Sequence, residues 1–393
     1  MTPAPPTRRW PGSRNSSAAS RTPTPAVRLE RLTAARLAAP AGAAATAAAS
    51  EGVPVELIGA VLTRDLVVDG GRWSKGRRLS AADLARFAAS PPAGVDGVTV
   101  IVPEAGDLHE DAAAERLARA VGGPGLETRG PVQSRVDLIA TADGVVHVRT
   151  AELERLNRLD PLEVFTRLDG SIVSAGDLVA SAKVAPHVVP ASIVEAAEAM
   201  TRAGARPLVR VAPFRPMTVA VVVKESLRAA DRPRFEASVR AKVESLGSRI
   251  SSIDYVADDD EPVREALARI ARGRRRSARA DVVLTAGGRS TDPSDPFFTA
   301  IAALGGRLVR QGVPAHPGSM LWLARIGRTA VLGLPTCGAY SKATAADLLL
   351  PRLLTGEPPT RRTVSALGHG GVLTREMRFR FPAYARELDA PDG

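Results

Sequence analysis

The sequence predicts an α/β protein whose largest domain is built on a mostly parallel sheet. From residue 217 onward, nearly continuous apolar strands alternate with helical segments. Strands of this kind indicate burial on both faces, as in parallel sheets covered by helices on each side. The length of 393 residues exceeds one average domain, so we expect about two or three domains.

The predicted α/β domain covers residues 213–358. Its predicted strands are 217–224, 248–257, 280–288 and 328–335. Its predicted helices are 232–247, 262–273, 295–306 and 342–356. The Pro-rich segment 356–360 closes the domain, and residues 359–393 are predicted to form a C-terminal β segment and tail, with 368–384 as a last hairpin or strand pair.

The N-terminal part divides into a tail and an accessory region. Residues 1–27 are rich in Pro, Ser, Thr and Arg and are predicted to be disordered. Residues 28–206 are predicted to form an accessory α+β region of short elements. Its clearest elements are a helix at 80–90, with Ser80 and Asp83 as a capping box, and a hairpin over 136–148.

Composition narrows the classes of ligand. The net charge of +11 is compatible with nucleic acid, a membrane surface or an anionic small molecule. Aromatic residues, at 4%, are not interleaved with the basic ones, and no zinc-finger or helix-turn-helix pattern is present. We therefore expect no nucleic-acid partner. Without a run of about 18 apolar residues, we also expect no membrane span and a cytoplasmic protein.

Cysteine and histidine usage excludes two kinds of site. Cys337 is the single cysteine, so neither an internal disulfide nor a thiolate cluster can form. The five histidines are scattered, with no pair at helical ligand spacing.

The stretch LTAGGRSTDPSD, residues 284–295, leaves a buried strand and enters a helix. Ligands of open α/β sheets bind at such strand ends. Gly287 and Gly288 let backbone amides approach a ligand, and a helix N-terminus favours an anion. Ser290 adds a hydroxyl. Taken alone, the pattern favours a glycine turn in which Asp295 caps the next helix.

Two further loops are predicted at the same edge of the sheet. PAHPGSM (314–320) offers Ser319 after a Pro-Gly turn, and GLPTCGAYSK (333–342) follows the last strand. In the second loop, Cys337 can equally pack as a small hydrophobe. The agreement of three loops favours a site for an anionic small molecule.

An acidic triplet, Asp258 to Asp260, follows another strand. These carboxylates either stabilise the N-terminus of the next helix or hold Mg²⁺ on phosphate oxygens.

These loops resemble those of the molybdopterin-binding domain family of molybdenum-cofactor biosynthesis. Within that family, the resemblance is to proteins like the molybdopterin molybdenumtransferases. ADVVLTAGGRSTDPSD resembles the family's GG-x-S loop with a following Asp, and HPGSM and GLPTCGAYSK resemble its next two loops. GVPAHPGSMLWL (312–323) and GHGGVL (368–373) resemble a subgroup often fused to a molybdopterin nucleotidyltransferase, a half that we do not find here. The resemblance covers roughly residues 30 to 385.

The resemblance implies a three-layer α/β domain, a homodimer, and molybdopterin or its nucleotide form as ligand. It implies catalytic roles for Asp295 and Asp259, and metal contacts by Asp295, Asp258 and Asp259, with Mg²⁺ and molybdate as the ions. The implied pterin contacts are Thr285, Gly287, Gly288, Ser290, Pro317, Gly318, Ser319, Leu334, Pro335, Thr336, Cys337, Ser341 and Lys342.

Departures from the family pattern separate binding from catalysis. The third loop has Thr336, Cys337 and Gly338 where metal-inserting enzymes carry Gly and Asn-Pro, and Asp292 stands at a family glycine. Pterin binding is therefore better supported than metal insertion.

We expect a molybdopterin-binding protein that acts at molybdate insertion into molybdopterin. The alternative is a carrier that passes the cofactor to a nucleotidyltransferase or an apo-molybdoenzyme. A nucleotide pyrophosphatase ranks lower, because it needs a stronger carboxylate cluster.

Overall fold

The structure is a computed structural model, and it describes residues 28–38, 53–224, 230–271, 273, 279–288, 291–334 and 343–386. Clustering of contacts divides the chain into two compact units, Met1–Asp107 and Leu108–Gly393. The accessory region expected at 28–206 therefore spans this division. Its two parts bury separate apolar cores, one centred on Leu62 and Trp73 and the other on Leu117 and Val136.

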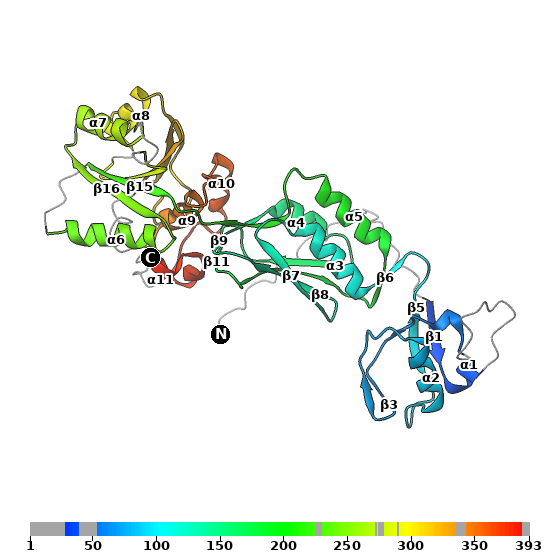
Figure 1. Ribbon diagram of the computed structural model, residues 1–393. Coiled ribbons are helices and arrows are strands. Elements are labelled where there is room, and N and C mark those ends of the chain that lie inside the picture. The colour runs from blue at the N-terminus through cyan, green and yellow to red at the C-terminus, as the bar shows by residue number, and fades with distance from the viewer. Residues whose placement is uncertain are drawn as a thin grey trace, which may run out of the picture. The chain divides into compact units, whose positions relative to one another are not determined.

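The first unit is a small α+β fold (Figure 1). Its three-stranded antiparallel sheet has the order β1-β5-β2, and β3 pairs with β4 in a hairpin. Ser80 and Asp83 form the predicted capping box at the start of α2. The elements are β1 (Arg28–Leu32), α1 (Ala34–Ala38), η2 (Val55–Leu57), β2 (Val61–Leu62), β3 (Leu66–Val68), β4 (Gly71–Trp73), α2 (Ala81–Ala89) and β5 (Val98–Val102).

The second unit begins with antiparallel strands and three helices. One sheet has the order β10-β12-β8-β7, another the order β11-β9-β14, and β6 pairs with β13. The elements are β6 (Asp107–His109), α3 (Glu110–Val121), β7 (Leu126–Val132), β8 (Arg135–Ala140), β9 (Gly144–Val148), α4 (Thr150–Leu156), β10 (Leu162–Thr166), β11 (Ile172–Val173), β12 (Leu178–Val184), β13 (Val188–Pro190), α5 (Ala191–Arg202) and β14 (Val209–Pro213).

The hairpin predicted over 136–148 is wrong, although both of its strands exist. β8 pairs with β7 and β12, whereas β9 pairs with β11 and β14 in a different sheet. The connecting segment is held from outside: the carboxylate of Asp143 accepts a bond from the N–H of Ala175 at 2.8 Å, and its carbonyl accepts from Phe214 at 3.0 Å. These non-local bonds outweigh the local turn signal.

The predicted α/β domain has a six-stranded sheet in the order β16-β15-β17-β20-β19-β18. Neighbours from β16 to β20 are parallel, and the two pairs at the β18 edge are antiparallel. The elements are β15 (Thr218–Lys224), α6 (Arg232–Glu244), β16 (Arg249–Val256), α7 (Asp260–Ala271), β17 (Val282–Ala286), α8 (Pro296–Ala303), β18 (Arg307–Gln311), β19 (Trp322–Ile326), β20 (Thr329–Gly333) and α9 (Ala345–Leu353).

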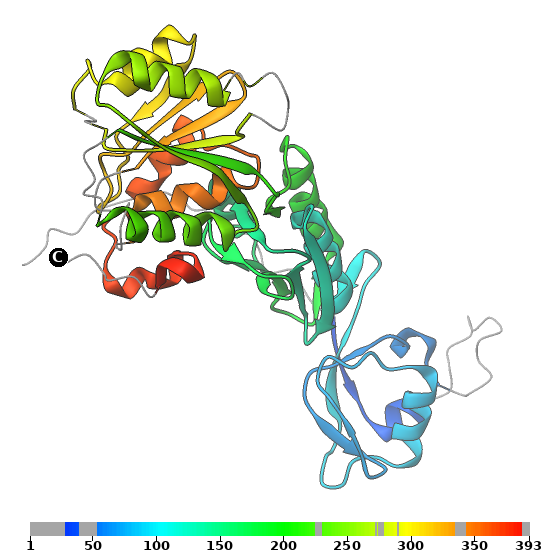
Figure 2. The ribbon, with the colours of Figure 1, turned by 60° about the vertical axis from the view of Figure 1, so that its left-hand side comes forward.

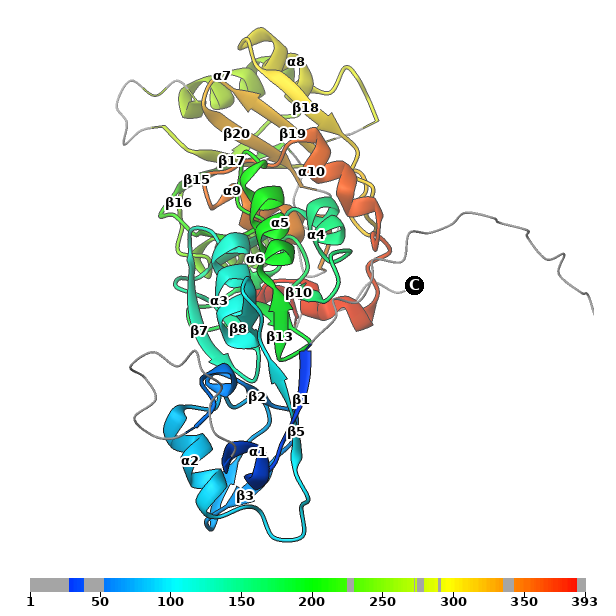
Figure 3. The same ribbon diagram turned by 90° about the vertical axis from the view of Figure 1, so that its right-hand side faces the viewer.

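Helices cover both faces of this sheet, which confirms the mostly parallel α/β class and makes the domain three-layered (Figures 2 and 3). Val221 of β15 packs in the core shared with α6 and α9, and the adjacent Val222 packs in the core shared with α7 and α8. Each such fully buried side chain contributes roughly 1.5–3 kcal/mol. Burial on both faces explains why β15 reads as an almost unbroken apolar run.

The strand order places a topological switch point beside β15. The chain moves from β15 to β16 on one side and then returns to β17 on the other side. The crevice outside the carboxyl ends of β15 and β17 is the place where such sheets bind ligands. Because β18 runs in the same direction as β20, the loop after β18 also lies at this edge.

The C-terminal β segment predicted in 359–393 is wrong for the described residues, which form α10 (Arg361–Ser365), η5 (Ala366–Gly368), η6 (Arg375–Arg380) and α11 (Ala383–Arg386). Within the described residues 368–384, β pairing is limited to one isolated bridge, between Val372 and His316. The alternation in MRFRF suggested a strand, but Phe379 is 63% exposed and Phe381 is buried in the core beside α6 and α9. One anchored ring followed by Pro382 suits a short helical turn.

No helix within the described ranges is both long and apolar enough to cross a membrane.

His147 on β9 makes the stability of the second unit depend on pH. Burial, followed by the nearby guanidiniums of Arg210 and Arg352, lowers its pKa from 6.5 to about 4. The unfolded chain therefore binds a proton before the folded chain does as the pH falls. The histidine contributes stability above pH 6.5, and this contribution, about 3 kcal/mol, is lost as the pH falls to about 4.

We predict that His147→Gln reduces the loss of unfolding free energy between pH 7 and pH 4, as measured by urea denaturation at each pH. The exposed His369→Gln is the control and should follow wild type. Parallel curves for wild type and His147→Gln would contradict the assignment.

Candidate functional site

The candidate site is the carboxyl edge of the parallel sheet, defined here by the segments that follow β15, β16, β17, β18 and β20. In the sheet register, Val223 of β15 stands opposite Ala286 of β17, and Lys224 stands opposite Val256 of β16. Lys224 is therefore the last residue of the central strand, at the switch point. From there its side chain can reach the segments after both neighbouring strands.

The ammonium of Lys224 joins two of the predicted metal ligands. Its Nζ lies 2.8 Å from Oδ2 of Asp295 and 2.8 Å from Oδ1 of Asp258. The side chains of Lys224 and Asp295 are 0% and 1% exposed, whereas that of Asp258 is 41% exposed. The structure therefore brings Asp258 and Asp295 together, around a positive charge supplied by the chain itself.

Asp295 also caps the helix that follows it. Its Oδ1 accepts from the N–H of Phe297 at 2.9 Å, which satisfies one N–H in the first turn of α8. The Phe297 ring lies under Lys224, with Nζ 5.5 Å from the ring centroid. Trp322 of β19 packs against both Phe297 and Phe298. Asp295 thus has a helix-capping role and an ion-pairing role at the same time.

The glycine loop after β17 has the conformation that its sequence requires. Gly287 has φ of 86°, in the region that favours glycine. A Cβ at Gly288 would meet Phe297 at 3.4 Å and Trp322 at 3.6 Å, so the backbone lies against this aromatic pair. Thr285, two residues before Gly287, is 1% exposed, and no partner for its hydroxyl is found among the described residues. The hydroxyl of Thr285 is therefore not accessible to a ligand in this structure.

The loop after β18 is fixed against the start of α9. The carbonyl of Pro317 accepts from the N–H of Ala345 at 2.9 Å, and that of Ser319 accepts from Val313 at 2.8 Å. Gly318 has φ of 100°, and a Cβ there would lie 2.9 Å from the backbone nitrogen of Ala345. Pro317 and Gly318 are buried and Ser319 is half-buried. These residues position the loop, and of the three only Ser319 offers a partly exposed polar side chain.

The third loop lies mostly outside the described residues. Leu334 is described: it is 6% exposed, and its N–H donates to the carbonyl of Thr285 at 2.8 Å. This bond ties the end of β20 to the end of β17. The predicted contacts outside the described residues are Ser290, Pro335, Thr336, Cys337, Ser341 and Lys342.

Asp259 serves the start of a helix in this structure. Its carboxylate accepts from the N–H of Asp260 at 2.8 Å, at the first residue of α7. Asp260 in turn accepts from the hydroxyl of Thr299 at 2.7 Å, which links α7 to α8. This arrangement matches the helix-stabilising interpretation of the acidic triplet. Asp259 is exposed and stays a prediction as a catalytic or metal-binding residue.

The described side chains of this edge are mainly acidic, so a phosphate there would depend on backbone N–H groups. Among the described residues at the edge, carboxylates outnumber the one cation, Lys224, which already has two of them. No group of three or more His, Cys, Asp or Glu side chains in the described ranges is placed to hold a metal ion. A divalent cation at Asp258 and Asp295 would have to displace the ammonium. The basic Arg289 and Lys342 lie outside the described residues.

Sequence reasoning missed the role of Lys224. It identified the strand 217–224 and both carboxylates, but assigned no role to the lysine that ends the strand. The available signal was a lysine ending an apolar strand, two residues after Val222, which faces α7 and α8. Side chains two apart on a strand share a face, so a charge was bound to be buried there.

Comparison with known families identifies the domain. Residues 222–355 match the family model described as "Probable molybdopterin binding domain". These residues match the molybdopterin-binding domain family, over about a third of the chain. The match begins within β15 and extends just past α9, so it contains the whole carboxyl edge. No curated protein matches the chain.

Solved structures of molybdopterin-biosynthesis proteins are similar to parts of this chain. The MoeA protein of molybdopterin biosynthesis from Pyrococcus horikosii is 17% identical, with a TM-score of 0.27. The match covers 64% of this chain and 81% of the MoeA chain. The MoaB enzyme of molybdopterin biosynthesis from Thermus thermophilus is 20% identical, covers 36% of this chain over 98% of its own, and has a TM-score of 0.27. Similarities this low say nothing about activity.

We predict that Lys224→Met destabilises the α/β domain by about 3–5 kcal/mol, because it removes the ammonium that pairs with the buried carboxylate of Asp295. Asp295→Asn should also destabilise the domain. The double variant should lose less than the sum of the two single losses, with about 1–3 kcal/mol of coupling.

The measurement is urea denaturation followed by the fluorescence of Trp322, with Trp10 and Trp73 replaced by Phe. Trp322 packs beside this site, so its signal reports this domain separately from the first unit. Lys183→Met, at a half-buried strand lysine, is the matched control. Strictly additive losses would show that Lys224 and Asp295 do not interact.

A second prediction concerns the loop after β18. Gly318→Ala should cost about 1–3 kcal/mol more than Gly305→Ala, because only the former adds a backbone clash to the strain of positive φ. Gly305 has φ of 69°, with nothing within 4 Å of an added Cβ. Unfolding free energies of the two variants check this, and equal losses would contradict the close approach of the loop to α9.

Proposed function

We propose that this protein binds molybdopterin at the carboxyl edge and holds it for transfer to a partner. The family match supports the ligand, because it covers the strands and loops that form this edge. The observation that carries the second half of the proposal is the position of Lys224 between Asp258 and Asp295. An internal ammonium that already pairs with both carboxylates occupies the point at which they would hold a metal ion.

The pterin phosphate has a place at the glycine loop. Gly287 and Gly288 present backbone rather than side chains at the switch point, beside the aromatic pair of Phe297 and Trp322. Backbone N–H groups of such loops bind phosphate oxygens at short range. Bound molybdopterin would supply the dithiolene that holds molybdenum.

The second candidate is catalysis of molybdate insertion, as in a molybdopterin molybdenumtransferase. It is favoured by the convergence of Asp258 and Asp295 on one point, since two carboxylates at a strand end can hold Mg²⁺. It requires Lys224 to leave that point. The proposal includes a protein partner, which is either a nucleotidyltransferase or an apo-molybdoenzyme. It also includes assembly of this chain as a homodimer.

The test is a titration of the purified full chain with molybdopterin, followed by pterin fluorescence. We predict saturable binding by wild type and at least about tenfold weaker binding, or 1.4 kcal/mol, by Gly288→Val. Ala302→Val places the same valine side chain on the exposed side of α8 and is the control. No binding by wild type would overturn the whole proposal.

Catalysis is then tested with molybdate and Mg²⁺ on the pterin-loaded protein, using activation of an apo-molybdoenzyme as readout. If the protein is a carrier, wild type and Asp295→Asn should yield the same amount of active cofactor. A large loss of metal insertion in folded Asp295→Asn, with pterin binding intact, would favour the enzyme over the carrier.

A further inference from the structure

The opposite edge of the same sheet carries a groove that the proposed function does not use. We call it the amino-edge groove; it consists of two cavities of about 350 Å³ and about 520 Å³ that share Arg325, Ala330, Leu353 and Pro358. It lies where β15 and β17 begin and where the β19–β20 hairpin turns. Cavities of roughly 300–1,000 Å³ accommodate small organic ligands.

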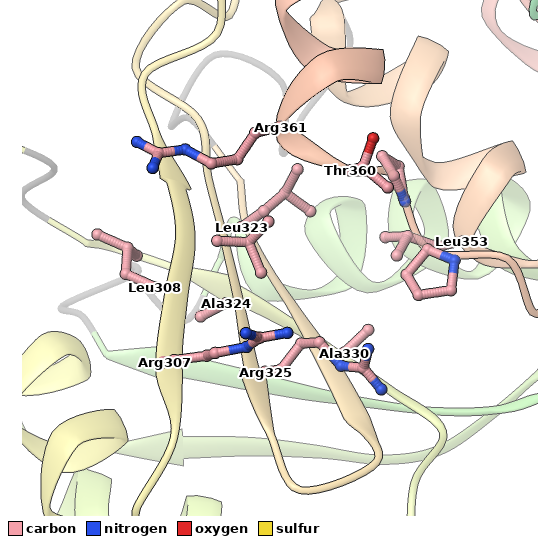
Figure 4. Close-up of a pocket in the computed structure, with 12 residues that line it drawn as sticks. Arg307, Leu308, Leu323, Ala324, Arg325, Ala330, Leu353, Thr360 and Arg361 are labelled. Carbon is pink, nitrogen blue, oxygen red and sulfur yellow. The ribbon is translucent and has the colours of Figure 1, made fainter.

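The smaller cavity is lined by apolar side chains together with three arginines, Arg307, Arg325 and Arg361, of which Arg325 also lines the larger cavity. Figure 4 shows side chains of β18, β19 and β20 on one side of it, with Leu353 and Thr360 on the other. Leu308, which is 43% exposed, and the buried Leu323 contribute much of its wall. The apolar side chains of this cavity suit the uncharged body of a ligand.

The larger cavity is basic. Its lining includes four arginines and a single acidic side chain, Asp281. The Asp281 carboxylate accepts from the N–H of Thr218 at 3.0 Å, so part of its acceptor capacity is used within the sheet. The four arginines are Arg215, Arg279, Arg325 and Arg328.

A like-charge pair strengthens the case for an anionic ligand. Arg307 of β18 stands directly opposite Arg325 of β19, so both side chains are on one face of an antiparallel pair. Like charges in this position are destabilising. Within the described ranges, neither arginine has a carboxylate at ion-pair distance. By contrast, Arg129 of β7 stands opposite Asp137 of β8.

We propose that the amino-edge groove binds a small organic phosphate of nucleotide size. Planar guanidiniums bind phosphate oxygens through paired N–H donors, and an anion between Arg307 and Arg325 relieves their repulsion. The apolar side chains of the smaller cavity, among them Leu308 and Leu323, contact the less polar part of the same molecule. Among the described residues, no aromatic side chain lines either cavity, which disfavours a nucleic-acid strand held by base stacking.

The test measures binding of ADP, pyrophosphate and adenosine to the full chain by calorimetry. We expect ADP to bind at least about fivefold more tightly than pyrophosphate and adenosine not to saturate, because both parts of the groove are needed. Leu308→Ser should reduce the preference for ADP over pyrophosphate.

Arg325→Gln should weaken ADP binding at least about tenfold, with Arg328→Gln as a second variant of the same cavity. Arg129→Gln is the control, because it removes the same charge from an exposed strand arginine elsewhere. Thermal melting supplies a second readout. Arg325→Gln should raise the Tm of the ligand-free protein, since it removes the like-charge pair, and should reduce the rise in Tm that ADP causes.

Three outcomes would overturn the proposal: no saturable ADP binding, equal loss of binding in Arg129→Gln, or pyrophosphate binding as tightly as ADP. The variant Gly288→Val distinguishes ADP binding at the amino-edge groove from ADP binding at the carboxyl edge. It should leave ADP binding unchanged, and loss of ADP binding in that variant would place the nucleotide at the carboxyl edge instead.

Discussion

The contact of Lys224 with Asp258 and Asp295 organises the carboxyl edge of the molybdopterin-binding domain. An ammonium with a fully buried side chain is tolerated only when carboxylates and hydrogen bonds replace the water that it has lost. Asp295 can do this because the N–H of Phe297 fixes one of its oxygens and leaves the other for Lys224. The cap of α8, the end of β15 and the segment after β16 therefore depend on one another.

This dependence limits what the site can do chemically. Two carboxylates that converge at a strand end resemble a divalent-cation site, but here they carry two negative charges around one positive charge. A metal ion at the same point adds charge repulsion unless the lysine moves. An ammonium cannot polarise a bound oxyanion as a divalent ion does, because it forms hydrogen bonds and not coordination bonds. At this point of the edge, a metal ion and the ammonium of Lys224 therefore compete for the same two carboxylates.

The class of the α/β domain could be predicted from sequence because its sequence signals are local and repeated. Continuous apolar strands such as 217–224 recur between helices, and glycines mark the strand exits. The hairpin at 136–148 could not be predicted correctly, because bonds to Ala175 and Phe214 decide where its strands pair. Asp258 and Asp295 were identified, but the partner that joins them was not, since sequence spacing does not show which charge a buried carboxylate meets.

Charge is distributed unevenly between the two edges of the sheet, and this bears on the basic character of the whole chain. The carboxyl edge gathers carboxylates around an internal cation, whereas the amino-edge groove gathers arginines with Asp281 as its single lining acid. The net charge of +11 by itself does not show where an anion would bind. Guanidiniums that face one another across β18 and β19 raise the local potential at a defined place, and screening by salt leaves such short-range fields largely intact. An anion therefore gains more at this groove than at arginines that already face acids.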